Sequence, residues 1–152
     1  MMKKITFIIL IYLFSFNSAN SQSMIPLEKY ISENDPTKPA SVVYLTNRCA
    51  ALYTYISGLI GENNKKTSDI YMHSAGKLSF WASELMITEF GNTQEEAIKS
   101  SMDTILKMID FYKQDSANNY AKTGEYMLGS YMEQDTNLCK IITEQTLQKI
   151  RN

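Results

Sequence analysis

Histidine, cysteine and glycine are scarce in this chain of 152 residues. The lone histidine, His73, cannot supply the several imidazoles of a zinc or copper site, and no HxxxH or HExxH spacing occurs. The two cysteines form neither a CxxC nor a CxxCH motif, which argues against a thiol–disulfide exchange enzyme and a c-type haem site. None of the six glycines belongs to a phosphate-binding loop. We therefore expect a non-enzymatic protein with no catalytic residues, no metal ligands and no cofactor.

Neither sign of charge is in large excess. The chain has 15 basic and 16 acidic residues, and the charges are interspersed. Removal of residues 1–21 would take away two lysines and leave 13 basic against 16 acidic residues, a net charge of −3. Neither a nucleic-acid-binding patch nor a polybasic membrane patch is indicated. Nucleic acid is therefore not an expected partner.

The only long apolar run lies near the N-terminus. Two lysines precede residues 5–16, a run of 12 residues that is apolar at all but two positions and shorter than the roughly 20 needed to span a membrane. Ala19 and Ser21 provide the small side chains that signal peptidase tolerates. We predict a signal peptide over residues 1–21, cleavage before Gln22, and an exported, periplasmic or secreted product without stable membrane insertion. The alternative is a retained anchor or a buried first helix.

The two cysteines, Cys49 and Cys139, are an even pair in a chain predicted to be exported. Such a pair predicts one disulfide, and the alternatives are unpaired buried thiols or a redox or metal function. Arg48 precedes the first cysteine, and Asp135 lies one helical turn before the second. A bridge would bring these charges together, so we predict a structural ion pair.

Apolar residues recur at spacings of three and four along most of the remaining chain, which is typical of amphipathic helices. The expected long helices cover residues 40–60, 68–90 and 131–150, with a further one, the third in chain order, that begins at residue 94. Asn118, Asn119 and Gly124 indicate a break in this third helix after Lys113, and the alternative is that it continues to about Lys122. Because no apolar alternation typical of strands occurs, we predict an all-α fold, an antiparallel bundle of four or five helices. Its first and last long helices would be joined by the disulfide. An irregular lead-in, residues 22–38, would precede a single domain over residues 39–152, with a short turn of helix at residues 27–31.

The third long helix has the clearest start, because Thr93 and Glu96 fit a capping box. Ser130 and Glu133 suggest a second one before the last helix. The stripe expected to be buried on the third helix consists of Ile98, Ser101, Met102, Ile105, Met108, Ile109 and Tyr112. Its outer face carries a row of alternating charges at four-residue steps, namely Glu95, Lys99, Asp103 and Lys107. Such a row is typical of a solvated face.

The stretch between residues 120 and 132 is rich in tyrosine and methionine, which are enriched at protein interfaces. The candidate interaction surface consists of Tyr120, Tyr126, Met127, Tyr131 and Met132. The alternative is that the stretch packs onto the bundle.

Residues 49–58, CAALYTYISG, resemble the first helix of some small periplasmic immunity proteins, although those usually bring a second cysteine much sooner than residue 139. The resemblance implies an inhibitor or immunity-type role. The residues themselves favour a protein-binding module with a partner in the cell envelope. The alternatives are a carrier of a small apolar ligand within the bundle and an envelope enzyme whose site is assembled from scattered residues.

Overall fold

The computed structural model describes residues 24–151, and these residues form helices joined by short loops, with no strand among them. The elements in chain order are α2 (Leu27–Glu33), α3 (Pro39–Ile60), the 3-10 helix η2 (Gly61–Asn64), α4 (Lys65–Phe90), α5 (Gln94–Thr123) and α6 (Tyr131–Arg151). The predicted all-α fold class is confirmed. The predicted signal peptide and its cleavage site between Ser21 and Gln22 lie outside the described residues.

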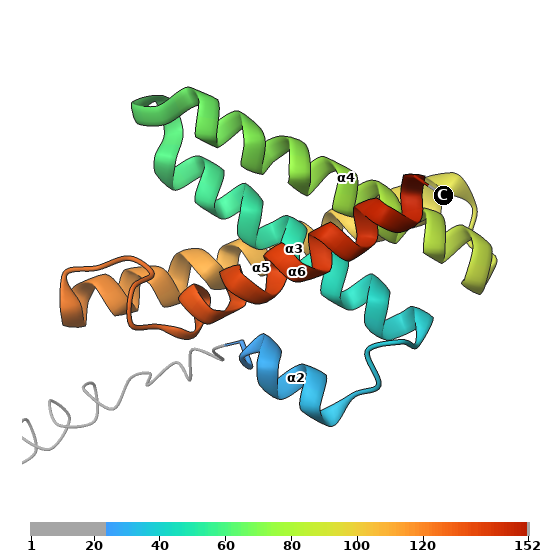
Figure 1. The fold of residues 1–152 in the computed structure, drawn as a ribbon, viewed down its shortest axis with the longest axis horizontal. Helices are drawn as coiled ribbons and strands as arrows, with labels where there is room; N and C mark the ends of the chain where they lie inside the picture. Colours follow the sequence, from blue (N-terminus) through green and yellow to red (C-terminus); the bar gives the residue numbers. More distant parts are fainter. Residues whose placement is uncertain (1–23, 152) are drawn as a thin grey trace, which may run out of the picture.

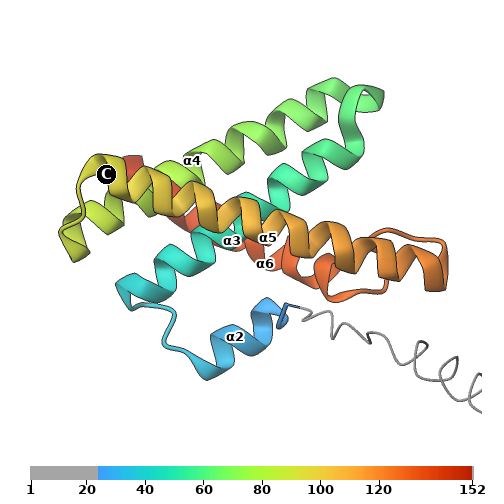
Figure 2. The ribbon, with the colours of Figure 1, turned by 180° about the vertical axis from the view of Figure 1, so that it is seen from behind.

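Helix α3 runs through the middle of the molecule and passes between α5 and α6 (Figures 1 and 2). In Figure 1 α6 lies in front of α3 and α5 lies behind it, and the reverse view in Figure 2 exchanges them. Helix α4 turns back after η2 and packs along α3, while α2 packs against α6. Every residue from 45 to 53 is consequently buried. A helix covered on all sides in this way forms the core.

Local sequence signals set most of the helix ends. Thr93 Oγ1 accepts a hydrogen bond from the Glu96 amide at 3.3 Å, and the Glu96 carboxylate accepts one from the Thr93 amide at 2.9 Å, so the predicted capping box is confirmed. Gly91 ends α4 with a φ of +71°, which a glycine adopts without strain. The start of α4 was predicted too late, because Asn64 is its N-cap and accepts from the Thr67 amide.

The start of α6 differs from the second predicted capping box. The Ser130 hydroxyl accepts from the Met132 amide at 3.2 Å, and the Glu133 carboxylate accepts from the Gly129 amide at 2.9 Å. A capping box requires each of the two side chains to accept from the backbone amide of the other residue. Here both side chains cap the first turn, but they accept from the amides of Met132 and Gly129 instead.

The segment predicted as an irregular lead-in, residues 22–38, contains helix α2, which extends beyond the short turn expected at residues 27–31. Leu27, its first residue, is fully buried and belongs to the core. Part of the lead-in is therefore an element of the fold.

The buried face of α5 is rotated from the predicted one. Ser101, Met108, Ile109 and Tyr112 are buried as expected, but Ile98 is 46% exposed and Met102 is 57% exposed. Helix α5 packs on α3 and α4 through Ala97 and Ser101. The side chains that face the neighbouring helices here are thus small, and the larger side chains of Ile98 and Met102 next to them remain in solvent.

The predicted disulfide between Cys49 and Cys139 is confirmed, with an S–S distance of 2.10 Å. It joins α3 to α6, the first and last long helices, and both cysteines are fully buried. The bridge lies where these two helices cross, at the centre of the fold.

Replacement of both cysteines by alanine (Cys49→Ala with Cys139→Ala) is expected to lower the free energy of unfolding by about 3–5 kcal/mol. The bridge closes a loop of 90 residues, and its removal gives the unfolded chain more freedom. Urea denaturation followed by circular dichroism measures the loss. A loss under about 1 kcal/mol would contradict the expected constraint on the unfolded chain.

Candidate functional site

The predicted ion pair between Arg48 and Asp135 forms in the interior. Arg48 Nη2 lies 2.6 Å from Asp135 Oδ2, and both side chains are 0% exposed. The pair is adjacent to the disulfide in sequence, because Cys49 follows Arg48 and Cys139 lies one turn after Asp135. Helices α3 and α6 are thus joined by a covalent bond and by a buried ion pair at the same crossing.

Three other groups complete the hydrogen bonding of this pair. Arg48 Nε donates to the Tyr112 hydroxyl at 3.2 Å, and Nη1 donates to the Tyr44 hydroxyl at 3.0 Å. The Leu27 amide donates to Asp135 Oδ1 at 2.8 Å. Among the described residues, no buried side-chain nitrogen or oxygen lacks a hydrogen-bond partner. Helices α2, α3, α5 and α6 therefore all meet at one charge pair.

Burial raises the pKa of the Asp135 carboxyl, against the opposing effects of the Arg48 guanidinium and the Leu27 amide. Burial by itself lowers the pKa of Arg48, but Tyr112 and Asp135 outweigh it and the pKa is raised. Arg48 therefore keeps its charge. Because neither side chain of the pair is exposed, neither can meet a substrate from solvent, and the role of the pair is structural.

Asp135→Ala is expected to destabilise the protein by about 3–5 kcal/mol, because it leaves the Arg48 charge buried without its partner. The double variant Arg48→Met with Asp135→Leu removes both charges and is expected to recover most of that loss. Chemical denaturation with the disulfide intact compares the two.

An exposed pair gives the matched control. Lys65 and Asp69 lie 3.4 Å apart with both side chains more than half exposed, so Lys65→Ala is expected to cost under about 1 kcal/mol. Equal losses for Asp135→Ala and for the double variant would show that packing, and not the unpaired charge, sets the penalty.

Aromatic side chains extend outward from the ion pair. The Tyr112 ring stacks with Tyr55 at 6.2 Å on one side and with Tyr131 at 6.4 Å on the other. The Tyr55 hydroxyl donates to Ser116, and the Tyr131 hydroxyl donates to Asp115 Oδ2 at 2.6 Å. The pKa values of four tyrosine hydroxyls are raised, mainly because these side chains are removed from water. The four residues are Tyr53, Tyr55, Tyr112 and Tyr131.

These raised pKa values predict alkaline unfolding. The folded protein retains its protons on these hydroxyls above the ordinary tyrosine pKa of 10.0, whereas the unfolded chain loses them. The stability they provide is complete below pH 10 and falls as the pH rises further. Tyrosinate absorbance and circular dichroism, recorded through an alkaline titration, are expected to show these four tyrosines ionising together with loss of helix. Their ionisation while the helices persist would contradict the raised pKa values.

The structure divides the predicted interaction surface. Tyr120 and Tyr126 are 48% and 49% exposed, and their rings stack with centroids 4.5 Å apart. Met127 and Tyr131 are half-buried, and the Tyr131 hydroxyl is directed inward by its hydrogen bond. Met132 is 0% exposed, so its assignment to the surface was wrong. The first turn of α6 packs Met132 into the core.

Hydrogen bonds within the loop hold the exposed tyrosines in place. Asn119 Nδ2 donates to the carbonyls of Glu125 at 2.8 Å and Leu128 at 3.1 Å, and Thr123 Oγ1 accepts from the Glu125 amide at 3.1 Å. Leu128, which lies in the same stretch, is 56% exposed. We call Tyr120, Tyr126 and Leu128 the aromatic loop surface. It lies at the left end of the molecule in Figure 1, where α5 turns back toward α6.

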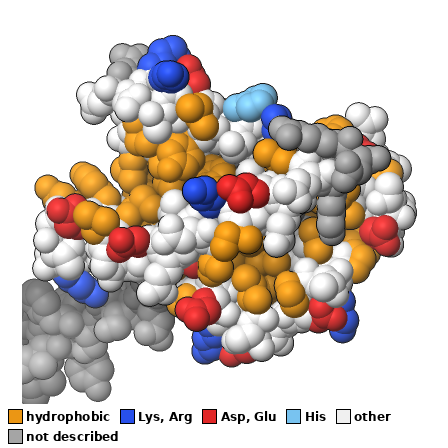
Figure 3. All heavy atoms as spheres, viewed as in Figure 1, with side chains coloured by type: hydrophobic (Ala, Val, Ile, Leu, Met, Phe, Trp, Pro, Cys, Tyr) orange, Lys and Arg blue, Asp and Glu red, His pale blue; other side chains and the backbone are white. Residues whose placement is uncertain are grey.

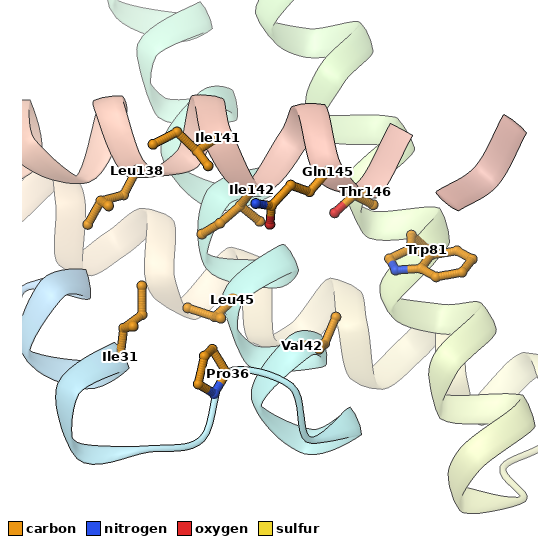
Figure 4. A pocket seen from close by; sticks show the side chains of 10 residues that line it. All are labelled: Ile31, Pro36, Val42, Leu45, Trp81, Leu138, Ile141, Ile142, Gln145 and Thr146. Atoms are coloured by element: carbon orange, nitrogen blue, oxygen red, sulfur yellow. The ribbon is translucent and has the colours of Figure 1, made fainter. Parts of the chain in front are cut away.

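A second surface feature is an apolar groove of about 260 Å³ between α2, α3, α4 and α6 (Figure 4). Its lining consists of Ile31, Pro36, Val42, Leu45, Trp81, Leu138, Ile141, Ile142, Gln145 and Thr146. Figure 3 shows hydrophobic side chains gathered on this face, on both sides of α6. The sequence did not predict the groove, which depends on where α2 docks.

Other candidate chemistry is sparse in the part of the chain that the structure describes. His73 is exposed on α4, and no group of three His, Cys, Asp or Glu side chains there is placed to hold a metal ion. No helix within residues 24–151 is long and apolar enough to cross a membrane. The chain matches no described protein family, and comparisons with curated proteins and with solved structures find no similar chain.

Proposed function

We propose that this chain is an exported, non-enzymatic helical module that binds a protein partner in the cell envelope through the aromatic loop surface. The observation that carries the proposal is the pair of exposed tyrosine rings stacked at 4.5 Å, Tyr120 on the last turn of α5 and Tyr126 on the hydrogen-bonded loop that follows. Tyrosine provides a large contact area, and side chains fixed before binding lose little entropy on association. An inhibitor or an immunity factor would be one form of such a module.

Export is part of the proposal. Disulfides persist in oxidising compartments, so the Cys49–Cys139 bridge supports an envelope or extracellular location. Residues 1–21 have the composition of a signal peptide, with cleavage proposed before Gln22. We also propose that α3, α4, α5 and α6, with α2 packed against α6, form a single antiparallel bundle that acts as a rigid support for the loop.

A binding role is favoured over catalysis by the way the polar groups are used. An active site requires titratable side chains that converge in a cleft open to substrate. Here the buried charges of Arg48 and Asp135 satisfy each other out of contact with solvent. The groove is lined mainly by aliphatic side chains and Trp81.

The proposal is tested by capturing partners from an envelope fraction with three forms of the purified protein. Wild type is expected to retain a specific protein, and Tyr126→Ala is expected to raise the Kd for that protein at least tenfold, because interface tyrosines often contribute more than 1.4 kcal/mol. Phe90→Ala is the control, since Phe90 is a comparably exposed aromatic residue (53%) that lies at the end of α4 and not on the aromatic loop surface. Circular dichroism checks that each variant is folded.

A second candidate, a carrier of a small apolar ligand, is favoured by the groove beside Trp81. Its volume of about 260 Å³ approaches the lower end of the range for ligand sites. Solvent extraction and mass spectrometry of the purified protein distinguish the candidates. A stoichiometric apolar molecule, together with identical capture by wild type and Tyr126→Ala, would replace the partner-binding proposal with the carrier.

A further inference from the structure

Helix α5 carries a row of exposed apolar side chains. The row repeats every four residues and consists of Ile98, Met102 and Leu106, which are 46%, 57% and 56% exposed. Side chains four positions apart lie one above another on a helix, so the three form a continuous strip, the apolar row. Contiguous apolar surface of this kind marks an interaction site.

A charged row runs beside the apolar row. It consists of Glu95, Lys99, Asp103 and Lys107, all exposed and alternating in sign. Lys99, Asp103 and Lys107 each directly follow a member of the apolar row. Within one chain Lys99 Nζ lies 2.7 Å from Asp103 Oδ2, but both side chains are more than half exposed and remain accessible to a further partner.

A two-fold axis at the level of Ser101 makes the charged row complementary to itself. In a symmetric antiparallel pair of α5 helices, residues equally far from the axis lie opposite each other. Glu95 then faces Lys107 of a second copy, and Lys99 faces Asp103. A parallel pair in register would bring like charges together. The alternation of sign therefore selects a second copy in the antiparallel direction.

The same axis interleaves the two apolar rows. Along the contact between the two helices, apolar side chains of one copy alternate with those of the other. Successive side chains are two residues apart, about 3 Å, and Met102 of one copy lies next to Met102 of the other. One axis thus satisfies both rows.

We propose that the face of α5 formed by Ile98, Met102 and Leu106 joins two copies of this chain as an antiparallel homodimer. This face is separate from the aromatic loop surface, so the inference does not rest on the proposed function.

Sedimentation velocity of the purified chain over a range of concentrations provides the first test. Wild type is expected to dimerise reversibly, and Met102→Asp is expected to raise the dimer Kd at least tenfold, because it buries a charge without a partner. Ile70→Asp is the matched control, since Ile70 is also 57% exposed and lies on α4. This control is expected to leave the dimer unchanged.

A charge-exchange experiment tests direction and register. Lys99→Glu and Asp103→Lys each place like charges opposite in a homodimer, so each variant alone is expected to dimerise at least about fivefold more weakly than wild type. An equal mixture of the two is expected to form heterodimers. In a mixed pair the introduced glutamate faces the introduced lysine, and the unchanged Lys99 of one copy faces the unchanged Asp103 of the other. Mixing does not restore the ion pair within either helix, so recovery reports contact between chains.

A wild-type chain that remains monomeric at millimolar concentration would overturn the proposal. So would a dimer that Met102→Asp leaves intact, or a charge-exchange mixture that associates no better than its components. A chain that remains monomeric but still captures a partner through the aromatic loop surface would contradict the dimer and leave the proposed function intact.

Discussion

The guanidinium of Arg48 lies at the centre of the molecule with no access to water, and its charge is balanced by a single carboxylate. Removing such a charge from water costs several kcal/mol unless its partner and its hydrogen bonds are in place. Four helices supply them: Asp135 comes from α6, Tyr112 from α5, Tyr44 from α3 itself and the Leu27 amide from α2. A slip of α6 by one turn would move its carboxylate by about 5.4 Å and leave both charges buried alone. The pair therefore selects one arrangement of the helices.

The same cluster connects the core to the surface. Tyr112 binds the guanidinium and stacks with Tyr131, whose hydroxyl holds Asp115 near the end of α5. The loop that carries Tyr126 thus begins and ends on elements fixed by the buried tyrosines. This support holds the two exposed tyrosine rings in one geometry, although the loop itself buries few of its own side chains.

Local chemistry explains which features could be predicted from the sequence. The capping box at Thr93 and the ending of α4 at Gly91 depend on short-range hydrogen bonds and backbone freedom. The proximity of Arg48 and Asp135 followed from the cysteine pair, which brings two distant helices to one crossing. The exposure of Met102 and the burial of Met132 did not follow, because helix rotation depends on which small residues the neighbouring helices meet. The groove beside Trp81 was missed for a similar reason, since it depends on where α2 docks.

The contribution of α6 to the core has a consequence for the order in which the fold is completed. Asp135 and Cys139 are the partners on which Arg48 and Cys49 depend, and they follow Arg48 and Cys49 by 87 and 90 residues. In a chain exported N-terminus first, as we propose, the central helix would cross the membrane before its countercharge. Until α6 follows, α3 would hold an unbalanced charge among apolar side chains, and stable folding would be delayed. The separation of 87 residues between the arginine and its carboxylate would thus keep α3 from folding stably until α6 has also crossed.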